Sequence, residues 1–249
     1  MSRVLAAAGV AACATALAAA GCAASGGGIA GSGAAAETAR PAFEVISSRP
    51  AREGDALRAE DLEPLAVGSV RWRRAEGGEP FCVKTTGTAP RFEREDPVAT
   101  RTLVRADDGT VSLERQRDAT DGAVLVFTSP LLLAPARLAP GEEPASTSGI
   151  VTEREKARDN DGGRAQRTMR IASVDRVRTP MGEFDAVRVD ATLAMKVPFA
   201  SLRRETSTWV RAGVGPVAVR SDERVLVMGV VPRNRTETRV RLPEGGGAP

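Results

Sequence analysis

Short runs of β-forming residues separated by turn signals recur along most of this chain, and they constrain its fold more than any other feature. Between Phe43 and Leu242 the turn signals fall at residues 107–109, 118–122, 159–163 and 181–182. Aspartate and glycine in such positions favour hairpins, because glycine adopts positive φ without a steric penalty. Long helical periodicities are not seen, so parallel βαβ units are not expected. The pattern predicts a mostly antiparallel β domain.

The clearest strand spans residues 187–196, where apolar and polar residues alternate with a period of two. We interpret its apolar face as a candidate groove, formed by Val187, Val189, Leu193 and Met195. Two alternatives stay open. Either the face is open and concave and holds an acyl chain, or another layer covers it and these side chains are core.

Three further segments complete the predicted fold. The apolar runs 123–127 and 225–231 have the length of strands that are buried on both faces. Asp55 can cap one short helix over residues 56–63, which Pro64 would end. The domain is therefore predicted to be a single curved antiparallel sheet or half-barrel with one short helix.

The N-terminus has the pattern of a secretory signal. One positive charge in Met1-Ser2-Arg3 precedes an uncharged apolar stretch, residues 4–20. The cleavage region LAAAGC, which ends at Cys22, resembles the bacterial lipobox. This resemblance implies that residues 1–21 are removed and that Cys22 receives acyl chains such as palmitate. The alternative is an ordinary signal peptide cut at an Ala-x-Ala site, with Cys22 incidental.

A flexible tether is predicted to follow the anchor. Residues 22–42 are rich in Gly, Ala and Ser, and they contain little that could bury apolar area and offset chain entropy. We place the β-rich domain at residues 43–243 and a disordered tail at 244–249. The expected location is the cell envelope, facing the periplasm or the exterior. Ala23 stands where aspartate is associated with inner-membrane retention, which favours the outer membrane.

Two phrases in the second half of the chain resemble a known family. Residues 177–189 read VRTPMGEFDAVRV, and residues 209–217 read WVRAGVGPV. Both are similar to segments of secreted bacterial DUF3108/TapB-like proteins, and residues 64–72 and 131–141 add weaker similarity. The resemblance implies a LolA/LolB-like half-barrel, in a family without established catalytic residues. Physically, the TPMG segment predicts a turn, and the glycines around Val214 predict a bulge or bend beside the packing anchor Trp209.

Composition argues against several function classes. The chain has no histidine, three cysteines, 3% aromatic residues and a formal charge of +3. These values exclude histidine-based triads and zinc sites, and they disfavour a disulfide scaffold or a nucleic-acid partner. Paired carboxylates all lie in polar, turn-like contexts, unlike catalytic acids with a raised pKa. We predict a protein that is not an enzyme and has no cofactor or metal site.

Two local features leave alternatives open. Cys82 lies between Phe81 and Val83 and is predicted to be a small buried hydrophobe; the alternative is a redox or intermolecular role. A second feature is a face of alternating charge, formed by Arg233, Arg235, Glu237, Arg239 and Arg241. It predicts a charged edge strand that resists edge-to-edge pairing, or else a basic stripe that faces anionic lipid or cell-wall phosphate.

Two functions follow from these patterns. The first is an envelope-anchored, monomeric lipoprotein whose non-catalytic β domain has a structural or assembly role. The second is a tethered carrier that holds an acyl chain or an apolar partner segment on a concave sheet face. In both, the membrane is contacted through the lipid anchor at Cys22, and the further partner is an envelope protein or a lipid.

Overall fold

The structure is a computed structural model that describes residues 41–120, 122–154, 157–198, 200–227 and 231–244. The predicted signal peptide, Cys22, almost all of the tether and residues 245–249 of the tail lie outside these residues. The helical segments described are a 3-10 turn, η2 (Glu53–Asp55), and the helix α1 (Ala59–Leu62). None of the described helices is long and apolar enough to cross a membrane.

The rest of the described fold is built from fifteen strands. Their bounds are β1 Glu44–Arg49, β2 Leu57–Arg58, β3 Gly68–Arg74, β4 Phe81–Thr88, β5 Arg91–Asp96, β6 Ala99–Arg105, β7 Val111–Asp118, β8 Val124–Ala134, β9 Arg137–Leu138, β10 Ala145–Arg154, β11 Ala157–Thr179, β12 Gly182–Val197, β13 Ala200–Arg211, β14 Gly215–Val227 and β15 Val231–Arg241. The domain is mostly β and antiparallel, as the sequence predicts.

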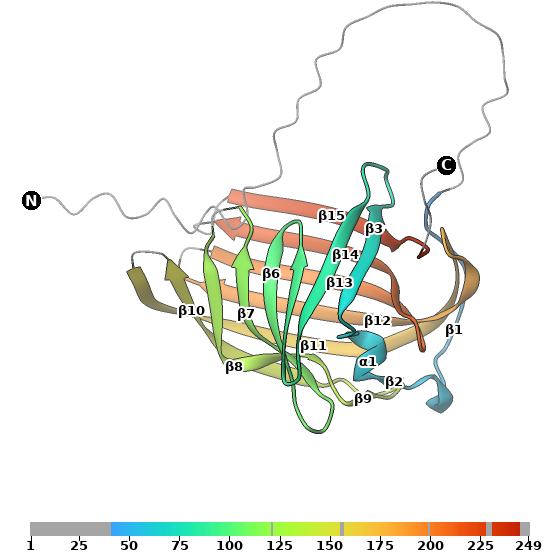
Figure 1. Cartoon of the computed structure of the whole chain (residues 1–249), viewed down its shortest axis with the longest axis horizontal. Helices are drawn as coiled ribbons and strands as arrows, with labels where there is room; N and C mark the ends of the chain where they lie inside the picture. Colours follow the sequence, from blue (N-terminus) through green and yellow to red (C-terminus); the bar gives the residue numbers. More distant parts are fainter. Residues whose placement is uncertain (1–40, 121, 155–156, 199, 228–230, 245–249) are drawn as a thin grey trace, which may run out of the picture.

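Twelve of these strands form a closed barrel (Figure 1). The order is β11-β10-β8-β7-β6-β5-β4-β3-β15-β14-β13-β12, and the pairing of β12 with β11 completes the circle. The prediction of a single curved sheet or half-barrel is therefore wrong about closure. The ring closes because β11 has 23 residues and pairs with β10 and β12 on its two edges, while β15 reaches β3. The β15–β3 contact joins residues far apart in sequence, which local patterns do not report.

Two predicted turns are present where the sequence places them. β11 ends at Thr179 and β12 begins at Gly182, whose φ is +111°. The bend around Val214 joins β13 to β14, and Gly213 and Gly215 have φ of +73° and +94°. The register also shifts between Trp209 and Val210, as in a β-bulge. Glycine is needed at these positions because L-residues, which carry a Cβ, rarely adopt such φ values.

Three local predictions are wrong. Residues 159–163 lie within β11 and do not form a turn; a Cβ on Gly163 would approach the Lys196 backbone oxygen to 2.8 Å, so this glycine permits close strand approach. The apolar run 225–231 is divided between the end of β14 and the start of β15. The predicted helix over residues 56–63 is reduced to α1, because residues 57–58 pair with β9 as strand β2.

A buried polar group holds strand β1, which pairs with the edge of β11, to the barrel. Asp175 on β11 is fully buried, and its Oδ2 accepts a hydrogen bond of 2.8 Å from the Trp209 indole N–H. Its Oδ1 accepts hydrogen bonds from the Ser48 and Ser173 hydroxyls at 2.6 and 2.7 Å. The ring of Phe43 packs 4.6 Å from that of Trp209. One carboxylate therefore connects β1, β11 and β13.

The segment that contains β2 and α1 covers one end of the barrel. Leu57 and Ala59 are buried, and the Asp61 carboxylate accepts a hydrogen bond of 2.8 Å from the Gly213 N–H in the β13–β14 turn. Leu62 and Glu63 then face the barrel interior. Since this segment precedes β3 in the chain, the barrel carries its own cover at the end where β13 meets β14.

The prediction that Cys82 is a buried residue is wrong. Cys82 is exposed on β4, whereas its neighbours Phe81 and Val83 line the barrel interior. Successive side chains of a strand point to opposite faces, so an interior Phe81 and Val83 require an exterior Cys82.

Candidate ligand-binding cavity in the barrel

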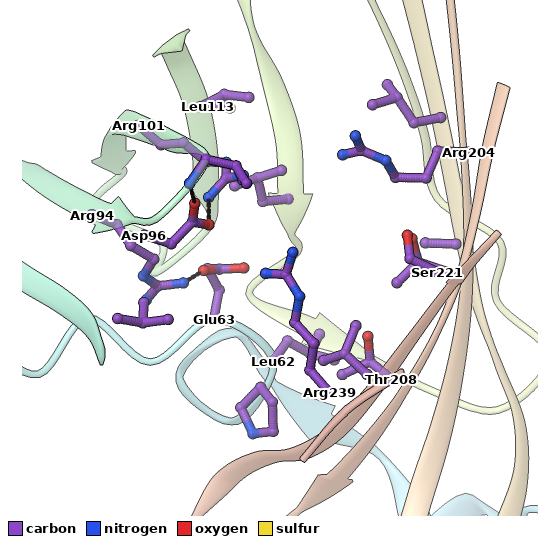
Figure 2. A pocket seen from close by; sticks show the side chains of 18 of the residues that line it. Leu62, Glu63, Arg94, Asp96, Arg101, Leu113, Arg204, Thr208, Ser221 and Arg239 are labelled. Atoms are coloured by element: carbon purple, nitrogen blue, oxygen red, sulfur yellow. Dashed lines mark hydrogen bonds and ion pairs between the residues drawn. The ribbon is translucent and has the colours of Figure 1, made fainter. Parts of the chain in front are cut away.

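The interior of the barrel contains a partly open cavity of about 390 Å³ (Figure 2). This volume falls in the range of small-molecule pockets, roughly 300–1,000 Å³. Much of the wall is apolar, with contributions from both halves of the barrel: Leu62, Trp72, Phe81, Val83, Val98, Leu103, Leu113, Leu131, Leu133, Met169, Val189, Ala191, Leu193, Pro216 and Val219. Interleaved with these residues are six arginines and four carboxylates, so the cavity is amphipathic.

The pairing register of β11–β15 arranges the inward side chains in rows. One row, here named the charged row, crosses five strands and consists of Arg167, Leu193, Arg204, Glu223 and Arg235. The next row towards the covered end consists of Met169, Ala191, Thr206, Ser221 and Glu237. Because directly opposed side chains of neighbouring strands lie about 5 Å apart, each row brings its members together.

Most charges of the long strands are paired. Arg204 Nε lies 2.7 Å from Glu223 Oε2, the residue opposite it on β14. Glu237 pairs with three arginines: Arg235 at 2.6 Å, and Arg239 and Arg74 at 3.0 Å each. Burial opposes ionisation of Glu237, but the hydrogen bonds and charges of these arginines outweigh it, so its pKa lies below the ordinary value. Glu237 is therefore ionised at neutral pH.

Strands β5 and β6 contribute to two further ion pairs, on the side of the cavity opposite to β11–β15. Asp96 Oδ2 lies 2.6 Å from Arg101 Nη1, and Oδ1 accepts 2.9 Å hydrogen bonds from the Val98 and Ala99 N–H groups. Burial would raise the pKa of Asp96, but Arg101 and the Val98 N–H group lower it overall. Arg94 pairs with Glu63, and burial lowers the pKa of Arg94 to about 10.

Figure 2 shows how the two sides face one another. Asp96 and Arg101 lie on one side of the cavity, Arg204 and Ser221 lie on the other, and the Arg239 side chain extends between them. Polar groups thus reach the cavity from both sides, while apolar side chains fill much of the wall between them. Such a lining suits a molecule with one apolar and one polar part.

Arg167 differs from the other arginines of the cavity. Its guanidinium makes no hydrogen bond or ion pair with any other residue that the structure describes. Burial, and then the nearby charge of Arg204, lower its pKa to about 10. Arg167 therefore stays protonated at neutral pH, and its charge is not balanced by a neighbouring carboxylate.

The four residues of the predicted groove share the inward face of β12. Val189 and Leu193 line the cavity. Val187 packs against the cluster that contains Leu57, and Met195 packs against the cluster that contains Leu103. The face is thus neither an open groove nor a solid core along its whole length, since its middle borders the cavity and its ends pack against apolar clusters.

The alternating charged face of β15 is not a surface stripe. Arg235, Glu237 and Arg239 line the cavity, and Arg241 is buried with its Nη1 donating a 2.7 Å hydrogen bond to the Val214 carbonyl. The prediction of a lipid-facing stripe is therefore wrong. β15 pairs with β14 along its length and with β3 at residues 239–241 only. Alternation shows that residues share a face, but not that the face points inward.

Several cavity residues have no signal in the sequence. Arg94, Arg101, Arg167 and Arg204 belong to a chain rich in arginine, so none stands out until the register brings them together. Among the described residues, no three Cys, Asp or Glu side chains group in a way that could hold a metal ion.

No family model and no curated protein matches this sequence. One similar solved structure is the hypothetical lipoprotein YmcC of Escherichia coli, with 13% identity, a TM-score of 0.35, and 73% of this chain and 89% of that chain covered. Another is described as a lipoprotein of Parabacteroides distasonis, with 12% identity, a TM-score of 0.28, and 72% and 95% covered. The resemblance to DUF3108/TapB-like proteins stays a prediction.

Proposed function

We propose that this chain is a membrane-anchored lipoprotein whose barrel binds a small amphiphilic molecule in its interior. The observation that carries the proposal is the cavity of about 390 Å³, whose wall combines apolar side chains with partly buried ion pairs. A ligand that binds the lumen of the folded barrel and not the unfolded chain adds stability. This develops the carrier hypothesis and moves the binding site from an open groove to the lumen.

The polar part of the lining supports a ligand with a polar end. A purely apolar ligand would leave the guanidinium and carboxylate groups without water, which is unfavourable unless they remain paired. An acyl chain with a polar head leaves the head beside the charged row and the chain beside residues such as Leu103, Leu113 and Leu131. Each methylene that enters the apolar part contributes about 0.8 kcal/mol.

The proposal includes the anchor at Cys22. Two acyl chains hold a protein on a membrane far more firmly than one reversible chain does. We expect Cys22→Ala to move the protein from the membrane fraction to the soluble fraction, as measured by fractionation and immunoblotting. A mutant retained in washed membranes would show that another feature provides the anchor.

The binding test uses the full chain with Cys22→Ala, so that no detergent is needed, and Nile red as a neutral fluorescent probe of apolar sites. Ala191 faces the cavity and Ala194 is exposed on the other face of the same strand. We expect the parent to bind the probe, Ala191→Phe to lose most of this binding, and Ala194→Phe to retain it. Since both substitutions add the same side chain to β12, the pair separates filling of the lumen from a general surface effect.

Two outcomes would overturn the proposal. A parent protein that binds no probe, and from which organic extraction recovers no lipid, would favour the structural or assembly role, which makes no use of a lumen. Equal binding by the Ala191→Phe and Ala194→Phe variants would place the probe outside the cavity. Urea unfolding of both variants checks that each is folded.

A further inference from the structure

We infer that the ligand is a single-chain amphiphile with an anionic head, carboxylate or phosphate, and that Arg167 is the residue that binds this head. The inference rests on the proposed function, because it names the ligand class of the same cavity. It is carried by the position of Arg167 in the charged row and by the way the other charges of the cavity are paired.

The position of Arg167 is fixed by two strand registers. Arg167 lies opposite Leu193 on β12, and Leu193 lies opposite Arg204 on β13. Two guanidinium groups therefore flank one leucine on the wall of the cavity. Arg204 is occupied by Glu223, whereas Arg167 has no partner among the described residues. The free group and the apolar surface beside it are the two elements that an anionic amphiphile requires.

The charges of the lining support the same conclusion. They comprise six arginines, namely Arg94, Arg101, Arg167, Arg204, Arg235 and Arg239, and four carboxylates, namely Glu63, Asp96, Glu223 and Glu237. Each of the four carboxylates already pairs with an arginine. The lining therefore has an excess of positive charge and no carboxylate left for Arg167. A bound anion supplies the missing partner, and guanidinium binds carboxylate or phosphate through two parallel hydrogen bonds.

The size of the cavity limits the tail. About 390 Å³ lies near the lower end of the range for small-molecule pockets, roughly 300–1,000 Å³. That space suits one short chain better than a lipid with two long chains. Met169 and Ala191 in the next row continue the apolar surface from Leu193 towards the covered end. The head is thus placed at Arg167 with the tail directed towards β2 and α1.

The test compares four competitors with the same chain: decanoate, decyl phosphate, decanol and decylamine. Each displaces Nile red from the full chain with Cys22→Ala. We expect decanoate and decyl phosphate to bind more tightly than decanol, and decylamine to bind most weakly. Whichever of the two anions binds more tightly identifies the head group. Arg167→Gln should weaken the anions by about 10- to 100-fold and leave decanol unchanged, because a hydrogen bond to a charged group is lost.

Three variants complete the design. Arg170→Gln removes an exposed arginine from the other face of β11 and should change no affinity. Arg167→Lys keeps the charge but not the paired hydrogen bonds, and should weaken the anions less than Arg167→Gln does. Leu193→Glu introduces a carboxylate between Arg167 and Arg204 and should abolish anion binding. If Leu193→Glu does not fold, the comparison of Arg167→Gln with Arg167→Lys still tests whether Arg167 binds the anionic head.

The outcomes separate this inference from the proposed function. If the parent binds no probe and yields no lipid on extraction, or if no competitor displaces the bound probe, the proposed function fails. If decanol and decanoate bind equally well to the parent, or if Arg167→Gln weakens all four compounds alike, the lumen binds amphiphiles but Arg167 does not select an anion. Equal losses in the Arg167→Gln and Arg170→Gln variants would likewise overturn the inference.

Discussion

The two halves of the barrel differ in how their strands are paired. In the long half, the pairs β11–β12, β12–β13, β13–β14 and β14–β15 contain between ten and fifteen opposed residues each. In the short half, β3 to β8, neighbouring strands share only five to seven. The long half therefore holds its side chains in extended rows, and this regularity aligns the charged row. The short half supplies much of the apolar wall and two local ion pairs.

The two halves meet at two short seams. β15 and β3 share three opposed residues, and β8 and β10 share four. Beyond those four, serine and threonine hydroxyls take the place of backbone carbonyls: Ser148 Oγ accepts the Ser129 N–H at 3.2 Å, and Ser146 Oγ accepts the Leu132 N–H at 3.1 Å. The barrel therefore gains its order from pairing within each half and its closure from a few long-range contacts between the halves.

The largest effect is expected at Asp175, which joins strand β1 to β11 and β13 of the long half. Asp175→Ala leaves the indole N–H of Trp209 and two serine hydroxyls without their acceptor in a buried site. We expect the free energy of unfolding to fall by about 3–5 kcal/mol. The corresponding change in the short half, Asp96→Ala, affects only one hairpin and the half-buried Arg101, and should lower it by about 1–3 kcal/mol. Urea unfolding measures both, and an equal loss would contradict the difference between the halves.

Low pH should lower the stability of both halves of the barrel. Burial raises the pKa of Asp175, Asp96 and Glu237, but hydrogen bonds and neighbouring arginines outweigh it, so each pKa lies below its ordinary value. A group with a lowered folded-state pKa contributes stability above its unfolded pKa, and this contribution is lost as pH falls through the folded pKa. We expect stability to be nearly constant above about pH 5 and to fall below about pH 4. Equal urea midpoints at pH 3 and pH 6 would refute this, and Asp175→Asn should flatten the fall.

Local features of the fold were predictable from the sequence. The turn at residues 179–182 and the bend around Val214 depend on proline and glycine, whose backbone preferences act within a few residues. The alternation in residues 187–196 identifies a strand because period two is also a local property. The antiparallel β class follows from these signals.

Closure and the binding cavity were not predictable in this way. The contact of Arg239 with Arg74 depends on residues that are far apart in the chain. The charged row depends on the register of five strands, and a shift of one residue would turn Arg167 or Arg204 to the outer face. The same limit explains Cys82 and β15, because a two-residue period does not say which face is inside. Which face of each strand is buried depends on how the strands close into the barrel.

A smaller effect is expected at the β8–β10 seam. Ser148 is buried, and its hydroxyl donates to the Gly149 carbonyl at 2.8 Å while accepting the Ser129 N–H. Ser148→Ala removes that acceptor, and we expect a loss of about 1 kcal/mol. Hydrogen exchange at the Ser129 amide should also accelerate, since local opening controls its exchange. Ser69→Ala, at an exposed position on β3, is the matched control and should change neither quantity. Unchanged Ser129 exchange in Ser148→Ala would show that the hydroxyl does not bridge the seam.

The smallest effect is expected at Cys82, on the outer face of the short half. Because this side chain is exposed, Cys82→Ser should change the free energy of unfolding by less than about 0.5 kcal/mol. The native protein should react with a maleimide at Cys82 nearly as fast as the denatured protein, as read from the labelled peptide by mass spectrometry. Moving the thiol by one residue provides the control. In a protein with Cys82→Ser and Val83→Cys, the new thiol faces the cavity wall and should react far more slowly in the native state than after denaturation. Rapid native labelling at both positions would mean that the short half is not packed as a closed wall, and the contrast between the two halves would then extend from pairing to solvent access.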